Sequence, residues 1–374
     1  MNKLMKLKTS LAVPDMVLGQ DVFSRPDHLI ASAGTKLTDR LITRLKFYSI
    51  QDIVILASSA PRQGRQTVQP VPPKKSSASA TEGSYIGRIK ASPEYRHFTA
   101  TFYSSFISYK AQLNEVVQKK APLKTEVLLA DISKIFATCN NPNTLLDMMI
   151  GIRNLDDATF VHSMNVALIC SLFAHWLKFD EKETLNLTLA GLLHDIGKMM
   201  IPPEIIKKPG KLTDEEYNII KEHPRLGYDI LKEQKVDEHV AMAALQHHER
   251  CDGRGYPNGL TLQEIAPYAK IVAIADVYDA LTAARVYRGP VCPLEVIGIF
   301  QNEGLTIYDP KYLMTFLDQI MYSYLNYNVS LSNGETGRII LMQRNSLDKP
   351  VIALPDGRFL DLRDEPELSI TGIV

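Results

Sequence analysis

The sequence is poor in cysteine and has no excess of charge of either sign. Its 374 residues include only four cysteines, scattered along the chain without a CxxC pair, which is typical of a reducing compartment. Lys and Arg together number 42, as do Asp and Glu, so no global field draws the protein to nucleic acid or to an anionic membrane. DNA is therefore not expected as a partner, and any attraction for phosphate must be local.

The chain also lacks a long, uninterrupted apolar run. Basic and apolar residues open the sequence, but Pro14, Asp15 and Gln20 interrupt them before a signal-peptide core could form. The most hydrophobic stretch, from Val166 to Trp176, is too short for a membrane span and predicts a buried helix. We therefore expect a cytoplasmic protein with no membrane partner.

Shifts in composition along the chain predict a multidomain protein. Residues 1–60 combine short β-like runs with an amphipathic stretch capped by Thr38, which predicts a small α+β module. Residues 61–84 are rich in Pro, Ser, Lys and Gln and predict a flexible linker. Helical apolar spacing over 85–325 predicts an all-α catalytic domain, and β-rich runs separated by turn sequences predict a small C-terminal β module over 326–374.

Five of the nine histidines lie in compact polar motifs of the predicted helical domain. Any one of them alone is more often a hydrogen-bonded core or surface residue than a ligand, but five together with aspartates form a surplus of metal-type donors. Imidazole and carboxylate suit first-row metals such as Fe and Mn, and a carboxylate can bridge two ions. Asp276 lies in an otherwise apolar helical stretch and needs a partner there, unless it and Asp279 both face solvent. A purely structural metal site would more often have four closed ligands and no surplus.

Two ions about 3.5–4 Å apart would lower the pKa of a bridging water and stabilise both oxygens of a phosphoryl transfer. This is the chemistry of phosphodiester hydrolysis. Lys198 follows the His194-Asp195 pair and could meet a non-bridging phosphate oxygen, while Arg285 and Arg288 offer forked hydrogen bonds. The alternative reading of these three cations is that they are solvated residues at helix ends.

The ordered series HSMNVA, LLHDIGK, KEHP, HHERCDGRGYP, ADVYDALTAARVYR and GLTIYDP resembles the HD-GYP family of the HD phosphohydrolases. The resemblance runs from about His162 to Phe316, and Gly255-Tyr256-Pro257 is the signature that gives the family its name. It implies an HD-type helical catalytic domain that hydrolyses cyclic di-GMP to linear pGpG, or onward to GMP.

The same resemblance implies a role for individual residues. It makes Asp195 a bridging ligand and, with Lys198, a catalytic residue. Members with a third ion carry a Glu one turn before the first histidine, where this chain has Ala158, so the expectation is two divalent ions, Fe or Mn, and pGpG as the main product. The implied metal ligands are His162, His194, Asp195, His223, His247, His248 and Asp276, and the implied substrate-binding residues are Lys198, Arg285, Arg288 and Tyr256.

Other functions stay open at this point. One is a catalytically silent receptor or scaffold for a cyclic dinucleotide, although such a protein would have no physical need for the full ligand set. Another is the same chemistry on a different cyclic dinucleotide or nucleotide. The flanking modules contain no catalytic set, so we expect them to regulate the enzyme or bind protein partners, and a homodimer is left open.

Overall fold

The structure is a computed structural model of the chain. It describes residues 4–9, 12–25, 28–38, 41–42, 45, 50, 52–56, 85–139, 142–152, 157–208, 212–282 and 292–374. The chain divides into two compact units, one of Met1–Ser76 with Lys208–Thr213 and one of Ser77–Lys207 with Asp214–Val374. The predicted linker over 61–84 lies outside the described residues.

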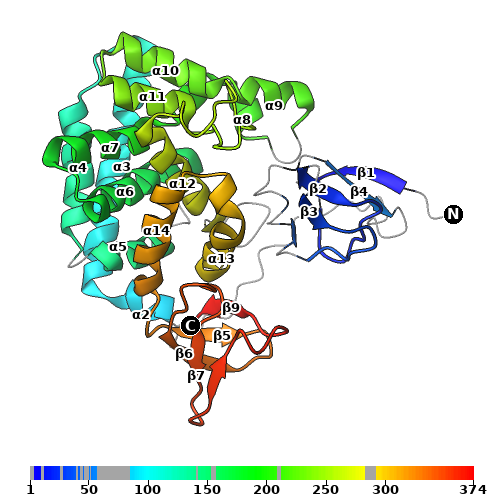
Figure 1. The fold of residues 1–374 in the computed structure, drawn as a ribbon. Helices are drawn as coiled ribbons and strands as arrows, with labels where there is room; N and C mark the ends of the chain where they lie inside the picture. Colours follow the sequence, from blue (N-terminus) through cyan, green and yellow to red (C-terminus); the bar gives the residue numbers. More distant parts are fainter. Residues whose placement is uncertain are drawn as a thin grey trace, which may run out of the picture. The chain divides into compact units, whose positions relative to one another are not determined.

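The larger unit is mostly helical, as the apolar spacing predicts (Figure 1). Its helices are α2 (Tyr85–Ala91), α3 (Pro93–Lys119), α4 (Thr125–Ala137), α5 (Pro142–Ile152), α6 (Ala158–Leu177), α7 (Glu181–Leu193), η3 (Ile196–Met200), α8 (Pro203–Ile206), α9 (Asp214–Ile220), α10 (His223–Glu233), α11 (Glu238–Gln246), α12 (Pro267–Thr282), α13 (Pro293–Glu303), η4 (Gly304–Thr306) and α14 (Pro310–Ser323). The prediction of a helical fold for this part of the chain is confirmed, while the domain bounds of 85–325 stay a prediction.

Helices α6 and α7 form the centre of the helical unit and pack closely against each other. Asp180 caps α7 through a reciprocal capping box with Glu183, which satisfies two backbone N–H groups at the start of the helix. Gly191 allows α7 to approach α6, because a Cβ at this position would lie 2.8 Å from Cys170 Sγ and 3.0 Å from Ala167 Cα. The two helices thus form a tight pair from which functional side chains can project at fixed positions.

Helix α6 is longer than its apolar run suggests. The expectation that no segment approaches membrane-spanning length is wrong for this helix, whose 20 residues have a mean hydropathy of 1.4 over the most apolar window. The apolar run was interrupted in sequence by Asn165 and Ser163, but the helix continues through them and buries both. Because 67% of that window is buried inside the unit, α6 has the surroundings of a core helix.

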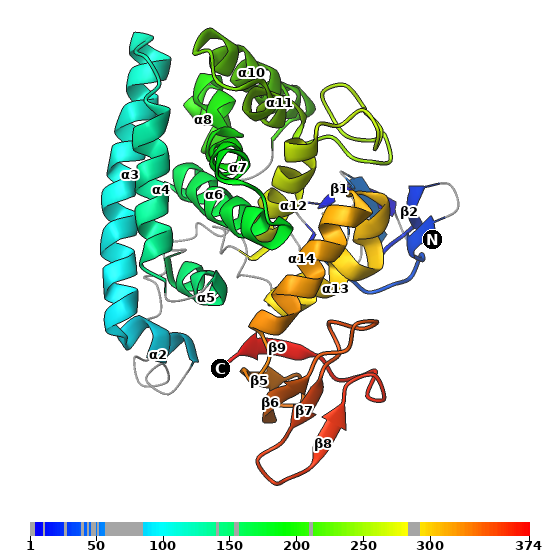
Figure 2. The ribbon, with the colours of Figure 1, turned by 60° about the vertical axis from the view of Figure 1, so that its left-hand side comes forward.

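Two long helices, α3 and α4, run side by side along one edge of the helical unit (Figure 2). Buried aromatic side chains of α3, including Phe98, Phe102 and Tyr109, face the rest of the unit. The Tyr109 hydroxyl donates a 2.5 Å hydrogen bond to the carbonyl oxygen of Leu192, two residues before His194. This bond ties α3 to the end of α7.

The C-terminal residues form a five-stranded antiparallel sheet in the order β8-β7-β6-β5-β9, which confirms the predicted C-terminal β structure. Its strands are β5 (Asn328–Leu331), β6 (Thr336–Leu341), β7 (Val351–Ala353), β8 (Phe359–Asp361) and β9 (Ile370–Ile373). The sheet belongs to the same compact unit as the helices. Gln301 of α13 connects the two, because its amide donates to the Arg344 carbonyl at 2.5 Å and accepts from the Leu347 N–H at 2.7 Å.

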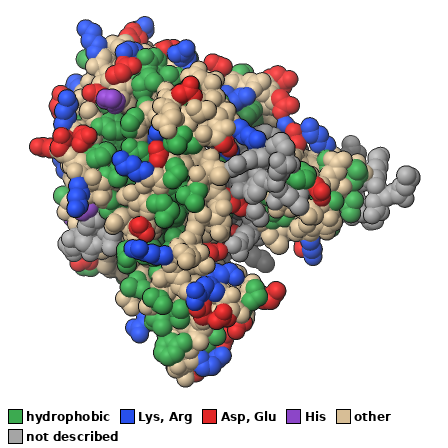
Figure 3. All heavy atoms as spheres, in the orientation of Figure 1, with side chains coloured by type: hydrophobic (Ala, Val, Ile, Leu, Met, Phe, Trp, Pro, Cys, Tyr) green, Lys and Arg blue, Asp and Glu red, His purple; other side chains and the backbone are tan. Residues whose placement is uncertain are grey.

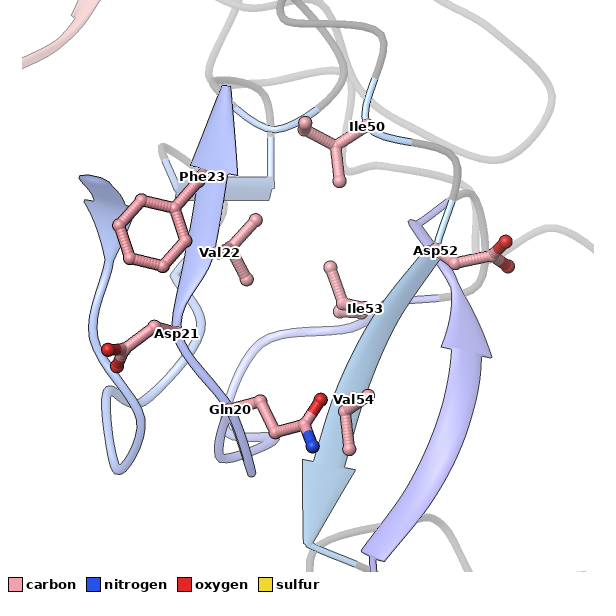
Figure 4. A pocket seen from close by; sticks show the side chains of 8 residues that line it. All are labelled: Gln20, Asp21, Val22, Phe23, Ile50, Asp52, Ile53 and Val54. Atoms are coloured by element: carbon pink, nitrogen blue, oxygen red, sulfur yellow. The ribbon is translucent and has the colours of Figure 1, made fainter. Parts of the chain in front are cut away.

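The smaller unit contains two antiparallel pairs, β1 (Leu4–Lys8) with β4 (Asp52–Leu56) and β2 (Val22–Arg25) with β3 (His28–Ala31). The predicted amphipathic helix after Thr38 lies largely outside the described residues. A hollow on this unit is lined mainly by side chains of β2 and β4, among them Val22, Phe23 and Ile53 (Figure 4). No histidine lines this hollow, so it does not contribute metal-type imidazoles.

On the face of the molecule shown in Figure 3, side chains of both charges are interspersed among the described residues. This distribution agrees with the equal numbers of acidic and basic residues in the sequence.

Candidate metal centre

The seven predicted metal ligands come together inside the helical unit, at the places where several helices begin or end. His194 and His247 stand at the C-caps of α7 and α11, and His223 begins α10, three residues after the last residue of α9. His162 lies in the second turn of α6, and Asp276 lies inside α12. Segments that are more than 100 residues apart in sequence, such as those of His162 and Asp276, therefore supply one site.

Asp195 occupies the middle of this cluster, with a side chain that is 1% exposed. Its Oδ1 atom faces His223 Nε2 at 3.3 Å and His247 Nε2 at 3.6 Å. Its Oδ2 atom faces His194 Nε2 at 3.4 Å and His162 Nε2 at 3.9 Å. The two oxygens of one carboxylate thus point to two different sets of imidazoles.

The ligand atoms fall into two groups, and within each group they lie within 4.8 Å of one another. These groups are Asp195, His223, His247 and His248, and His162, His194 and Asp276. Because an Asp195 oxygen also faces the second group, this carboxylate has the position required to bridge two cations.

Three of the histidines have their tautomer set by a backbone carbonyl three residues earlier. The Nδ1 atoms of His194, His223 and His247 bond to Gly191, Ile220 and Ala244 oxygens at 2.8, 2.7 and 2.9 Å. Those carbonyls are close to helix C-termini, where the backbone oxygens have no intrahelical partner. Each ring therefore carries its proton on Nδ1 and presents the Nε2 lone pair to the centre of the site.

A cation would stabilise this arrangement. The Nε2 atoms of His223 and His247 lie 3.3 Å apart, and with both protons on Nδ1 their lone pairs face each other. His194 Nε2 and Asp195 Oδ1 are buried and have no hydrogen-bond partner among the described residues. A buried polar atom without a partner costs about 1–3 kcal/mol. Divalent ions would satisfy all four atoms, and the nitrogen and oxygen donors suit first-row transition metals.

The pKa values of the cluster favour metal-binding forms for most of the ligands. Burial lowers the pKa of His247 to about 4 and holds the pKa of His248 well below its ordinary value, so both rings are neutral at pH 7. Burial acts to raise the pKa of Asp195, but His194 and the ammonium of Lys198 outweigh it, so the pKa is lowered and the carboxylate is ionised. Neutral imidazole and ionised carboxylate are the forms that bind a metal.

His162 differs from the other histidines in its partners. Its Nε2 lies 2.9 Å from Asp276 Oδ1, and its Nδ1 lies 2.7 Å from Asp279 Oδ2. Burial lowers the pKa of His162, but the hydrogen bonds to the two carboxylates outweigh burial and raise it to about 9. The reading in which Asp276 and Asp279 point to solvent is wrong, because they are 7% and 2% exposed.

The predicted substrate-binding residues are placed only in part. Lys198 Nζ lies 2.5 Å from Asp195 Oδ2, and its side chain is 24% exposed at the edge of the cluster. The Tyr256 ring stacks on His248, with centroids 4.7 Å apart and planes inclined by 27°. Arg285 and Arg288 lie outside the described residues.

Glu249 organises the loop that carries Tyr256, a role that sequence reasoning missed. It is 3% exposed, and its carboxylate accepts backbone N–H groups from Asn258 at 2.7 Å and Leu260 at 2.9 Å. Gly255 allows the loop to fold back close to the backbone of His248, because a Cβ at position 255 would lie only 2.5 Å from the His248 carbonyl oxygen. The sequence did contain an indication of this role: an acidic residue follows His247 and His248 directly and could have been predicted to bind backbone N–H groups of the loop after it.

Comparison with known proteins agrees with the resemblance seen in the sequence. Residues 147–312 match a family model described as HD domain. The cyclic di-GMP phosphodiesterase PA4108 of Pseudomonas aeruginosa is 35% identical over 211 residues, which are 56% of this chain and 50% of that protein. The cyclic di-GMP phosphodiesterase response regulator RpfG of Xanthomonas campestris is 38% identical over 202 residues, covering 54% of this chain and 53% of the relative.

A third relative has a different named substrate. The 3'3'-cGAMP-specific phosphodiesterase 1 of Vibrio cholerae is 43% identical over 145 residues, which are 39% of this chain and 34% of that protein. The chain spans about half the length or less of these curated relatives.

Gly197 provides a test of how tightly η3 must pack for the cluster to form. A Cβ at this position would lie 2.0 Å from the His223 oxygen and 2.5 Å from the Gly227 nitrogen, both backbone atoms. We expect Gly197→Ala to lower the free energy of unfolding by at least about 2 kcal/mol and to reduce metal content, because η3 and α10 must separate. Denaturant unfolding and metal analysis measure the two effects. Gly372→Ala is the control, because a Cβ at position 372 would have no other atom within 4 Å. A Gly197→Ala protein with the same unfolding free energy and the same metal content as Gly372→Ala would contradict this account.

Glu249 gives a second test, this one of the loop beside the cluster. Glu249→Ala removes a buried carboxylate and with it two part-buried, charge-assisted hydrogen bonds from backbone N–H groups, so we expect the free energy of unfolding to fall by about 2–4 kcal/mol. The matched control is Glu264→Ala, which removes an exposed carboxylate that also accepts a backbone N–H, from Thr261. Equal losses in the two variants, measured by denaturant unfolding, would show that Glu249 is not a buried anchor.

Proposed function

We propose, on the match of residues 147–312 to the HD domain family model, that the chain is a metal-dependent phosphodiesterase acting on a cyclic dinucleotide. The observation that carries the proposal is the Asp195 carboxylate, whose two oxygens face separate sets of imidazoles at 3.3–3.9 Å. Two divalent ions, Fe or Mn, are the proposed cofactors, and cyclic di-GMP is the preferred substrate.

In this proposal Asp195 is shared between two metal positions. His223, His247 and His248 would complete one, and His162, His194 and Asp276 would complete the other. When bound, the ions would lower the pKa of a coordinated water and stabilise charge on the phosphoryl group that is transferred. The protein contributes preformed lone pairs, because the tautomers of three histidines are fixed before any ion arrives.

Lys198 has the position of a residue that handles the phosphate. Its ammonium contacts Asp195 from the partly exposed edge of the cluster, so it can reach a non-bridging oxygen without leaving the site. A cation aimed at that oxygen stabilises the charge that develops as the ester bond breaks. Tyr256, stacked on His248, would present an aromatic face to a base or ribose, and Arg285 and Arg288 are kept as substrate contacts on the resemblance alone.

A second substrate has specific support. The relative with 43% identity is named for 3'3'-cGAMP, so a hybrid cyclic dinucleotide is the main alternative to cyclic di-GMP. A silent receptor has less support, because a protein that only binds nucleotide gains nothing from seven metal-type donors, five of them buried. The cytoplasmic location, the protein partners of the flanking modules and the homodimer stay predictions.

The proposed reaction can be tested with the full chain loaded anaerobically with Mn²⁺ or Fe²⁺. We expect hydrolysis of cyclic di-GMP to pGpG in chromatographic assays that include 3'3'-cGAMP and linear dinucleotides. Asp195→Ala should abolish both metal binding and hydrolysis, because it removes the shared carboxylate. Lys198→Ala, the matched variant, should retain its metal and lose about 100-fold in turnover. Tight nucleotide binding without turnover in the metal-loaded wild type would favour the receptor.

The number of ions is a separate prediction. Ala158, one turn before His162, cannot act as a ligand, and the described residues form two groups of metal-type donors. We therefore expect two ions per chain by elemental analysis of anaerobically purified protein, and pGpG as the main product. Three tightly held ions per chain would contradict this prediction.

A further inference from the structure

Asp279 lies next to the candidate metal centre without belonging to either group of ligands. It stands one turn after Asp276 on α12 and is 2% exposed. One of its oxygens lies 2.7 Å from His162 Nδ1, and the other accepts a 3.0 Å hydrogen bond from the Asn165 side-chain amide. Both oxygens of a buried carboxylate are thus directed at residues of α6.

The need for Asp279 follows from where His162 sits. The other three buried histidines that face Asp195 use free carbonyl oxygens near helix C-termini to hold Nδ1. His162 lies inside α6, where the carbonyls of the preceding turn accept hydrogen bonds within the helix. No backbone acceptor is available to its Nδ1, so a side chain from another helix must take that place.

We propose that Asp279 is a positioning residue that fixes the ring of His162, and that Asn165 holds Asp279 in place. The inference rests on the proposed function, since it concerns how His162 presents Nε2 to an ion. With Nδ1–H donated to Asp279, Nε2 is the ring atom directed at Asp276 and Asp195, and a bound ion would take the place of the proton that Nε2 shares with Asp276. A carboxylate partner also makes the imidazole a stronger donor than a carbonyl partner does.

The effect of Asp279 is local to one of the two ion positions. His162 belongs to the group with His194 and Asp276. In the part of the chain that the structure describes, no hydrogen bond or ion pair joins Asp279 to His223, His247 or His248. Loss of Asp279 should therefore weaken one ion and spare the other. A residue with only a structural role would weaken both ions or neither.

Two substitutions separate geometry from charge. Asp279→Ala removes the acceptor, and we expect the affinity of the weaker ion to fall about 10–100-fold. Asp279→Asn keeps an acceptor oxygen and loses the charge, so its loss should be smaller. Asn165 can adapt to Asp279→Asn, because its own Oδ1 is buried without a hydrogen-bond partner among the described residues and can accept from the new amide N–H after the Asn165 side chain turns over.

The experiment is a titration of metal-free full chain with Mn²⁺, followed by calorimetry, and with Co²⁺, followed by visible absorption of the bound ion. Asp131→Asn is the control, because Asp131 is a similarly buried carboxylate on α4 that is not among the candidate ligand groups. We expect two ions in the wild type and the control. We expect one tight and one weakened ion, with an altered Co²⁺ spectrum, in Asp279→Ala, and an intermediate result in Asp279→Asn and Asn165→Ala.

The outcomes distinguish this inference from the function on which it rests. Wild-type affinity for both ions in a folded Asp279→Ala protein would overturn the positioning role and leave the proposed function intact. Equal weakening of both ions in Asp279→Ala and Asp279→Asn would also overturn it. Failure of the wild type to bind Mn²⁺ or Co²⁺ would overturn the proposed function, and the inference with it. If circular dichroism shows that Asp279→Ala does not fold, Asp279→Asn replaces it in the test. The positioning role then requires that Asp279→Asn weaken the affinity for one ion and not for the other.

Discussion

The Asp195 carboxylate is ionised, 1% exposed and surrounded by imidazole nitrogens, and the helical unit is organised around this burial. Removing a charge from water costs several kcal/mol even after the surroundings relax. Within the described residues, Lys198 supplies one compensating ammonium, at 2.5 Å from Oδ2, but Oδ1 has no hydrogen-bond partner. Cations between Asp195 and the histidines would supply the remaining compensation, and their binding would then be coupled to folding of this unit.

The second constraint is the use of helix ends. A ring nitrogen can bind an ion only if the proton stays on the other nitrogen, and a carbonyl within reach of that nitrogen ensures this. Helix C-termini offer such carbonyls, and α7, α9 and α11 all end at the site. The His-Asp pair at the end of α7 therefore combines two needs: His194 takes its acceptor from Gly191, and Asp195 is carried into the centre by the turn that follows.

Much of this centre could be predicted from the sequence, because ordered motifs specify which histidines and aspartates meet. The helical part of the chain could be predicted from the helical spacing of its apolar residues, and the C-terminal β structure from β-rich runs separated by turn sequences. The contributions of Asp279 and Glu249 could not be predicted in this way. Each depends on a partner distant in the chain or across a loop, and in sequence each is an acid that could equally face solvent. The length of α6 was underestimated for a related reason: the buried polar residues Ser163 and Asn165 interrupt the apolar run without ending the helix.

The C-terminal sheet has a closer relation to the helices than a separate module would. Gly298 of α13 lies against Asp348, where an added Cβ would stand 2.5 Å from the Asp348 Cβ. Gln301 forms two hydrogen bonds to the same loop, and the Tyr327 hydroxyl donates to Asp147 of α5. Because α13 begins five residues after Arg288, the sheet braces the helix that follows the arginine segment. Movement of the sheet would require these contacts to break together, so its packing against α13 is part of what holds the helical unit in shape.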